Sequence, residues 1–182
     1  MKLDKLFAGL KQIANGDYVL EGNLICEEDL IIELDDRLVV KGKIEVKKSI
    51  EAGWGIKAGW GIEAGEGIKA GCGIEAGEGI KAGEGIKAGW GIKAGCGIKA
   101  GWGIEAGEGI EAKTFIHSEK RIFAGISVYH TSANCKKTIK CAELRKGEIC
   151  FGALVIEEPI TELTIAEIEQ KLGIKNLKIK EN

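Results

Sequence analysis

Three thiols and two imidazoles in the second half of this 182-residue chain are the side chains best suited to hold a metal ion or to move a proton. Cys135, Cys141 and Cys150 are separated by five and eight intervening residues, whereas paired ligands of structural zinc sites usually have about two to four between them. We therefore expect packed thiols and no metal site. His117 or His130 could act as a general base, because imidazole titrates near neutral pH, but we expect ordinary surface histidines. The sequence predicts no catalytic residue and no cofactor.

The other candidate residues are positioned by a six-residue unit, Ile-(Lys/Glu)-Ala-Gly-Xaa-Gly, which repeats from residue 50 to residue 112. Because side chains alternate along a strand, Ile and Ala share one face and the charged residue lies on the other. The charged face must meet water, so Ile and Ala face inward. We expect Gly-Xaa-Gly to turn the chain, since glycine reaches positive φ at little cost. Units of one conformation stack on one another, which predicts a solenoid.

The charges indicate how many units close one coil. Opposite charges on neighbouring coils attract, so the correct coil length should place Lys opposite Glu. Residues at charged positions three units apart have charges of opposite sign in six of eight cases. The same count gives three of nine for positions two units apart and four of seven for positions four units apart. Three units per coil are therefore predicted, which makes each coil a triangle with one six-residue unit on each side.

These patterns predict an all-β fold, a parallel β-helix (β-solenoid) over residues 17–128, with a cap at each end. Residues 1–16 place Leu3, Leu6 and Leu10 at helical spacing, which predicts a short capping helix. The six-residue period slips near residues 34–36, where we expect a longer corner. Residues 129–182 are expected to form a small α/β cap, because residues 164–167 are a capping box that opens a helical pattern.

The position before each Gly-Ile varies between Trp, Glu and Cys, and it holds the candidate binding residues. A core position could not exchange Trp for Glu so freely, so these side chains should lie outside, at the corners. In an 18-residue coil, Trp54, Cys72 and Trp90 stack in one column. Exposed Trp is enriched at binding hot spots, so we predict a partner-binding surface, although a cap or a second subunit could cover these side chains instead. The predicted partner-binding residues are Trp54, Trp60, Trp90, Trp102, Glu66, Glu78, Glu84 and Glu108.

Composition narrows the class of partner. The chain carries 26 basic and 28 acidic residues, a net charge of −2, and such a balance does not favour nucleic-acid binding. No apolar run approaches the length of a membrane span. The six cysteines form no compact disulfide framework, which favours reduced thiols and a cytoplasmic location. We therefore expect a protein partner, either another protein or a second copy of this chain in a homodimer.

In its period and its aliphatic anchor, the repeat resembles the left-handed β-helix of the hexapeptide-repeat proteins. That family usually has a small residue two positions before the aliphatic one. Here that position holds Trp, Glu or Cys, and Ala comes two positions after Ile. Acyltransferases of the family generally use a histidine base at a subunit interface. The resemblance thus implies an alternative function, a diverged hexapeptide-repeat acyltransferase in which His117 or His130 would be that base.

The near-identical repeats and the tail at residues 164–180 also resemble small proteins of phages and mobile elements. That resemblance implies an inhibitor of a host defence enzyme, which would act by occluding the surface of the enzyme. Our main hypothesis is therefore a non-enzymatic β-solenoid that binds a host protein, or itself, through its corners. A structural spacer or virion component is a further alternative.

Overall fold

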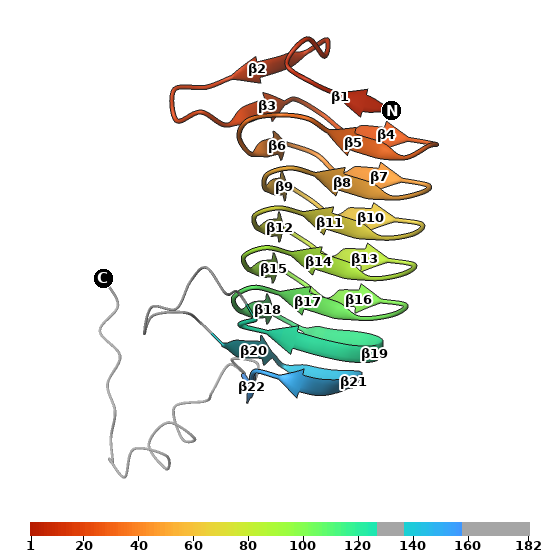
Figure 1. Cartoon of the computed structure of the whole chain (residues 1–182), viewed down its shortest axis with the longest axis vertical. Coiled ribbons are helices and arrows are strands. Elements are labelled where there is room, and N and C mark those ends of the chain that lie inside the picture. The colour runs from red at the N-terminus through yellow and green to blue at the C-terminus, as the bar shows by residue number, and fades with distance from the viewer. Residues whose placement is uncertain (127–136, 158–182) are drawn as a thin grey trace, which may run out of the picture.

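The computed structural model describes residues 1–126 and 137–157. Within these ranges the regular elements are all β-strands, and they pair in parallel except where β2 meets β3. Figure 1 shows these strands as a stack of similar coils that grows along the chain from one end to the other. The fold is therefore a β-solenoid, as the repeat predicts.

Each regular coil has three strands, which stack into three faces. Face 1 consists of β4 (Leu24–Cys26), β7 (Ile44–Val46), β10 (Ile62–Ala64), β13 (Ile80–Ala82) and β16 (Ile98–Ala100). Face 2 consists of β1 (Lys2–Leu3), β5 (Leu30–Ile32), β8 (Ile50–Ala52), β11 (Ile68–Ala70), β14 (Ile86–Ala88) and β17 (Ile104–Ala106). Both faces continue into β19 (Phe115–Ala124) and then β21 (Glu143–Phe151). Face 3 consists of β2 (Leu10–Gln12), β3 (Tyr18–Leu20), β6 (Leu38–Val40), β9 (Ile56–Ala58), β12 (Ile74–Ala76), β15 (Ile92–Ala94), β18 (Ile110–Ala112), β20 (Thr138–Cys141) and β22 (Ala153–Ile156).

The strand register confirms the triangular coil of three units. Ile62 pairs with Ile80, which lies three six-residue units further along the chain. At the start of the stack, Leu24 pairs instead with Ile44, so the spacing between these partners is two residues longer than three six-residue units. The two additional residues belong to the corner between β5 and β6, so the slip near residues 34–36 is a longer corner, as predicted.

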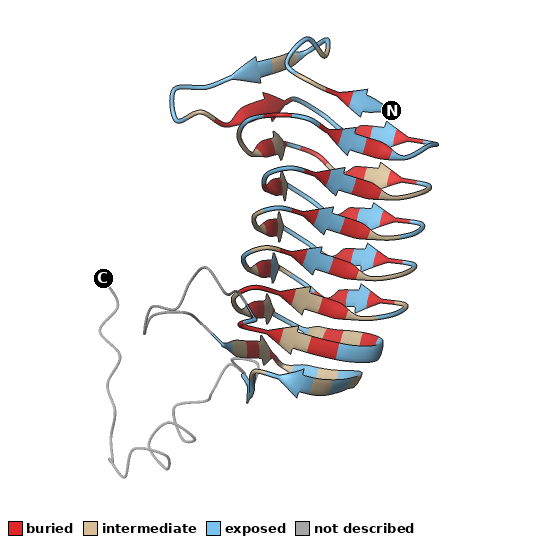
Figure 2. Ribbon diagram, viewed as in Figure 1, coloured by how far each residue is buried: buried red, intermediate tan, exposed pale blue. Residues whose placement is uncertain are grey.

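The interior is a column of Ile beside a column of Ala. From Ile50 to Ala112, each Ile and Ala of the repeat is at most 4% exposed, and Figure 2 shows the same alternation of buried and exposed positions coil after coil. The outward charges form ion pairs between neighbouring coils, at 2.5–3.2 Å: Glu51–Lys69, Lys57–Glu75, Glu63–Lys81, Lys87–Glu105 and Lys93–Glu111. Exposed ion pairs contribute little stability, so the buried Ile columns hold the stack together.

The predicted N-terminal helix over residues 1–16 is wrong, because this segment is β-structure. Strand β1 pairs in parallel with β5, and β2 pairs antiparallel with β3. The first coil presents an edge of backbone groups that need partners, and a strand satisfies them where a helix would not. The side chain of Leu3 closes the core at this end and is fully buried, whereas Leu6 is 93% exposed, so the helical spacing of the leucines marks no common buried face.

Stacked coils continue beyond residue 128, where we expected the C-terminal cap to begin. Strands β20 and β22 extend face 3, and Ile139 pairs with Ile110 of the preceding coil and with Leu154 of the following one. The expected helix and strand at residues 164–180 lie outside the described residues.

The glycines that follow Ala from Gly59 to Gly101 are explained by close packing between coils, and the positive φ expected for the repeat glycines is wrong. None of the glycines from Gly53 to Gly109 has a positive φ. A Cβ atom on Gly77 would lie 2.0 Å from the carbonyl oxygen of Gly59 in the preceding coil. Any side chain at this position would push neighbouring coils apart.

Replacing Gly77 by Ala should therefore lower the free energy of unfolding by about 1–3 kcal/mol, the usual effect of overpacking. Gly53→Ala is the matched control, since a Cβ at the same position of that repeat meets no atom within 4 Å. We expect Gly53→Ala to be neutral or to stabilise by up to about 1 kcal/mol, because Ala restricts the unfolded chain. Urea unfolding of both variants measures the difference, and equal effects would contradict the packing argument.

Candidate functional site

The variable positions of the repeat lie at the three corners of the coil, where they stack into three ridges. Backbone hydrogen bonds join most successive members of a ridge, as from the Trp90 amide to the Cys72 carbonyl (3.3 Å) and from the Glu108 amide to the Trp90 carbonyl (3.2 Å). Ridge A is Asp36, Trp54, Cys72, Trp90 and Glu108. Ridge B is Trp60, Glu78, Cys96 and Thr114, and ridge C is Lys48, Glu66, Glu84, Trp102 and Lys120.

All four tryptophans are about half exposed on these ridges. The exposed fractions are 46% for Trp54, 57% for Trp60, 48% for Trp90 and 53% for Trp102. The sequence therefore placed these residues correctly outside the core, and the described part of the solenoid does not bury them. The fold divides the eight predicted binding residues among three ridges, however: Trp54, Trp90 and Glu108 lie on ridge A, Trp60 and Glu78 on ridge B, and Glu66, Glu84 and Trp102 on ridge C. Only ridge A has two of the tryptophans.

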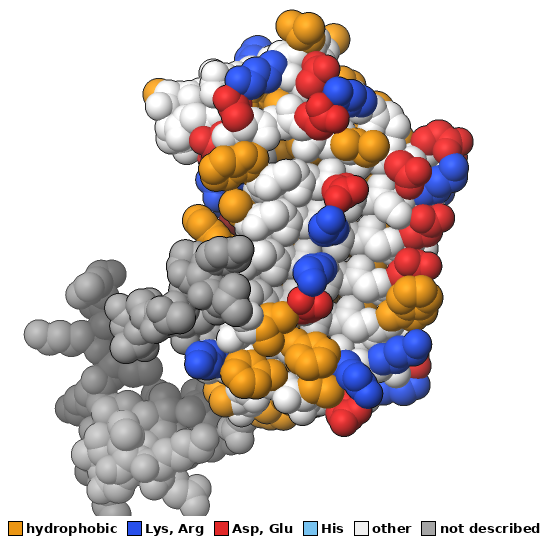
Figure 3. Space-filling model, in the orientation of Figure 1, with side chains coloured by type: hydrophobic (Ala, Val, Ile, Leu, Met, Phe, Trp, Pro, Cys, Tyr) orange, Lys and Arg blue, Asp and Glu red, His pale blue; other side chains and the backbone are white. Residues whose placement is uncertain are grey.

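A groove runs beside each ridge. Its floor is formed by the glycine that follows each ridge residue, its first wall by the ridge, and its second wall by the outward Lys and Glu of the strands. Figure 3 shows one such face, with two columns of coloured side chains separated by an uncoloured strip of glycine and backbone. The grooves exist because glycine has no side chain to fill the space between the two columns.

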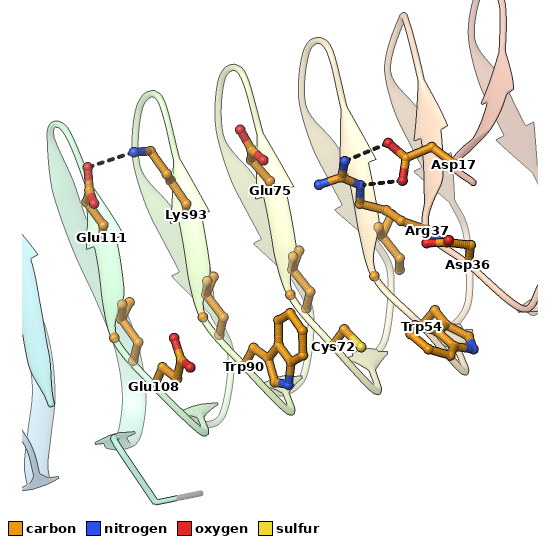
Figure 4. A pocket seen from close by; sticks show the side chains of 18 of the residues that line it. Asp17, Asp36, Arg37, Trp54, Cys72, Glu75, Trp90, Lys93, Glu108 and Glu111 are labelled. Atoms are coloured by element: carbon orange, nitrogen blue, oxygen red, sulfur yellow. Dashed lines mark hydrogen bonds and ion pairs between the residues drawn. The ribbon is translucent and has the colours of Figure 1, made fainter. Parts of the chain in front are cut away.

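Groove A, beside ridge A, has a volume of about 550 Å³ and extends over most of the stack. In Figure 4 the side chains of Trp54, Cys72, Trp90 and Glu108 follow one another along its lower rim. Burial raises the pKa of the Cys72 thiol, so this residue is a neutral, apolar group between the two indoles.

An ion pair closes the N-terminal end of groove A. Arg37 donates to both oxygens of Asp17, from Nη2 at 2.6 Å and from Nε at 3.2 Å, and Asn15 Nδ2 donates to the same carboxylate at 3.0 Å. The Arg37 guanidinium holds the pKa of the buried Asp17 below its usual range. This pair ties the first coil to the next and neutralises both charges, so neither is available to a ligand.

Carboxylates on the ridges differ from those on the strands. Each Glu of the repeat strands is in an ion pair with Lys, at positions 51, 63, 75, 105 and 111. Among the described residues, no ion pair includes Asp36, Glu78, Glu84 or Glu108, and Glu66 accepts a hydrogen bond from Ser49 Oγ at 2.8 Å. The sequence contains the signal for this difference, since no repeat from residue 54 to residue 108 has Lys at the ridge position.

The cysteines and histidines do not form a second site in the described part of the chain. Cys141 is buried in the core and Cys150 is exposed, so these two thiols are not packed together as expected, and Cys135 lies outside the described residues. No group of three or more metal-ligating side chains occurs in residues 1–126 and 137–157.

His117 lies on β19, where its Nε2 is 2.8 Å from Glu119 Oε1. Glu119 also forms an ion pair with Lys146. The lysine first, and the imidazole second, lower the pKa of this carboxyl to about 2. None of the three grooves is lined by His117, and His130 lies outside the described residues.

The fold and the ridges define the molecule as a β-solenoid with tryptophans at its corners, beside carboxylates that form no ion pair within residues 1–126 and 137–157. No family model, no curated protein and no solved structure matched this chain. The described residues contain no helix at all, and thus none that is long and apolar enough to cross a membrane.

Proposed function

We propose that this β-solenoid is a non-enzymatic protein that binds another protein, or a second copy of itself, through its tryptophan-bearing ridges. The observation that carries the proposal is the half-exposure of all four tryptophans at the corners of a rigid stack. Exposed indoles reduce solubility and are enriched at the centres of interfaces. A ridge whose backbone is fixed by hydrogen bonds loses little conformational freedom on binding, which favours affinity.

A β-solenoid of this kind would act on a partner by covering part of its surface. The resemblance to phage and mobile-element proteins favours a host defence enzyme as the partner and the cytoplasm as the place of action. Inhibition would then be stoichiometric and would need no turnover.

Replacing all four tryptophans by Glu should abolish binding and leave the solenoid folded. Glu already occupies four ridge positions of the same repeat, so the fold accepts it there. A buried Trp anchor often contributes more than about 2 kcal/mol to binding, so the quadruple variant should lose at least a hundredfold in affinity. Affinity capture from the native host, mass by light scattering, and thermal melting measure partner binding, self-association and folding.

The quadruple Trp→Tyr variant is the control, because it keeps an aromatic ring at each ridge position, and it should retain most of the binding. If the Glu variant melts as the wild type does and still binds the same partner or keeps the same mass, the ridges do not bind and the proposal fails. If the Glu variant does not fold, the tryptophans belong to the packed structure instead.

A further inference from the structure

Ridge A differs from the other two ridges, because two tryptophans stand between two carboxylates. Its order along the stack is Asp36, Trp54, Cys72, Trp90, Glu108, one residue per coil. In Figure 4 the Asp36 side chain lies above the rim that the other four form, near Arg37. At about 4.8 Å per coil, the backbone positions of the two tryptophans are about 9.6 Å apart and those of Asp36 and Glu108 about 19 Å apart. No Lys or Arg occurs on this ridge between its two ends.

The charge of groove A is therefore negative at two points. On the opposite wall, Lys57 pairs with Glu75 and Lys93 pairs with Glu111. The Asp17–Arg37 pair is likewise neutral, and Lys140, which also lines the groove, pairs with Glu157. Asp36 accepts a hydrogen bond from the Arg37 backbone amide at 2.7 Å, but no cation in the described residues pairs with Asp36 or Glu108. Complementary charges at an interface fix the register of a partner and disfavour partners whose charges have the same sign as the site.

Ridge C shows how a ridge tryptophan accommodates a cation. Lys120, one coil beyond Trp102 on the same ridge, places Nζ over the indole ring at 5.4 Å from the ring centroid. Such cation–π contacts are favourable at exposed sites. On ridge A the residue one coil beyond Trp54 is Cys72 and the residue one coil beyond Trp90 is Glu108. Ridge A thus has a thiol and a carboxylate at the places where ridge C has its lysine.

We infer that groove A binds an extended, basic segment of a partner protein. Two cationic side chains of this segment, six residues apart, contact Asp36 and Glu108, and the residues between them lie across Trp54 and Trp90. This inference rests on the proposed function and names the chemistry of the partner. Six residues of an extended or polyproline chain span about 19–20 Å, and three residues span about 9–10 Å, which matches both spacings of the ridge. Proline-rich segments are preorganised in this conformation and dock into aromatic grooves.

Three synthetic proline-rich peptides of equal length test the inference by isothermal titration calorimetry at low salt. The first has Arg at positions 1 and 7, the second has Arg at positions 1 and 4, and the third has Glu at positions 1 and 7. The first should bind at least tenfold more tightly than the second, and the third should not bind. Affinity for the first should fall as salt rises, because the pairs are exposed.

The double variant Asp36→Asn/Glu108→Gln should weaken binding of the first peptide at least tenfold. Glu78→Gln is the matched control, since Glu78 is an exposed ridge carboxylate that forms no ion pair within the described residues. It lies on ridge B, so this variant should leave the affinity unchanged. Equal binding of the Arg and Glu peptides, or no effect of the double variant, would overturn the inference.

Failure of this inference and failure of the proposed function give different results. If the peptides do not bind but the tryptophan-to-Glu variant still loses its captured partner or its self-association, the ridges bind a surface of another kind, and only the basic segment is excluded. If the tryptophan variant also has no effect, the proposed function itself fails.

Discussion

Replacing Ile80 by Asp is expected to prevent cooperative folding of the solenoid. Ile80 is 1% exposed and is stacked between Ile62 and Ile98 in the coils on either side. A carboxylate there would be surrounded by aliphatic side chains with no cation within the core, and an unpaired buried charge usually costs at least about 3–5 kcal/mol. Because each coil contacts only its neighbours, the defect would separate the stack into two shorter parts.

Lys81→Asp introduces the same residue one position later and is the control. Lys81 points outward, between Glu63 and Lys99 on the neighbouring coils. The variant loses the 2.5 Å pair with Glu63 but gains a cation, Lys99, on its other side, so stability should change by less than about 1 kcal/mol. Far-UV circular dichroism during heating measures both variants, and equal loss of stability would contradict the assigned faces.

The strict period of the repeat explains why the coil could be predicted from the sequence. Ile and Ala recur at fixed positions, and the chain has only one way to bury both while keeping Lys and Glu in water. The charge pattern then selected three units per coil, and the register confirms this choice. Local pattern and global fold agree in this region because every coil has the same environment.

The ends of the stack have no such repeated environment. Leu3, Leu6 and Leu10 have helical spacing, but the first residues form a strand that pairs with the open edge of β5. Of the three leucines, only Leu3 is buried in the core. The role of the repeat glycines could not be predicted either, because it depends on the distance between coils, such as the 2.0 Å that a Cβ on Gly77 would have to the oxygen of Gly59.

The candidate site was predictable in part. The exchange of Trp for Glu placed the variable residues at the corners, and the structure leaves them exposed. The prediction did not separate paired from unpaired carboxylates, because it treated the strand and ridge positions independently. It also did not include Asp36, which lies before the regular repeats in the longer corner at residues 33–37 and aligns with Trp54 because Leu38 pairs with Ile56.

Deleting one six-residue unit, Gly79–Glu84, should keep the fold and weaken binding at ridge A at least tenfold. The deletion preserves the phase of the repeat, so the stack continues with Gly85 after Glu78. Every residue beyond the deletion moves to the next corner, which takes Trp90 from ridge A to ridge C. All four tryptophans remain, but Trp54 and Trp90 no longer share a groove.

Stability should change little, since each coil depends mainly on its neighbours and the new neighbours keep favourable charges. Glu63 would face Lys87, and Glu75 would face Lys99, in place of the present pairs Glu63–Lys81 and Glu75–Lys93. Thermal melting and binding of the peptide with Arg at positions 1 and 7 measure the two effects separately.

Deleting Gly91–Cys96 removes the same number of residues and is the matched control. It leaves Trp54, Cys72 and Trp90 on ridge A and, of the ridge A residues, moves only Glu108 to another corner. This variant should therefore bind the peptide as weakly as Glu108→Gln alone, and more tightly than the Gly79–Glu84 deletion. If the two deletion variants bind the peptide equally well, the tryptophan pair contributes nothing to affinity, and the partner does not recognise the order of residues along ridge A. If either deletion unfolds the chain, the three corners are not interchangeable, and the triangular coil requires contacts beyond those between neighbouring units.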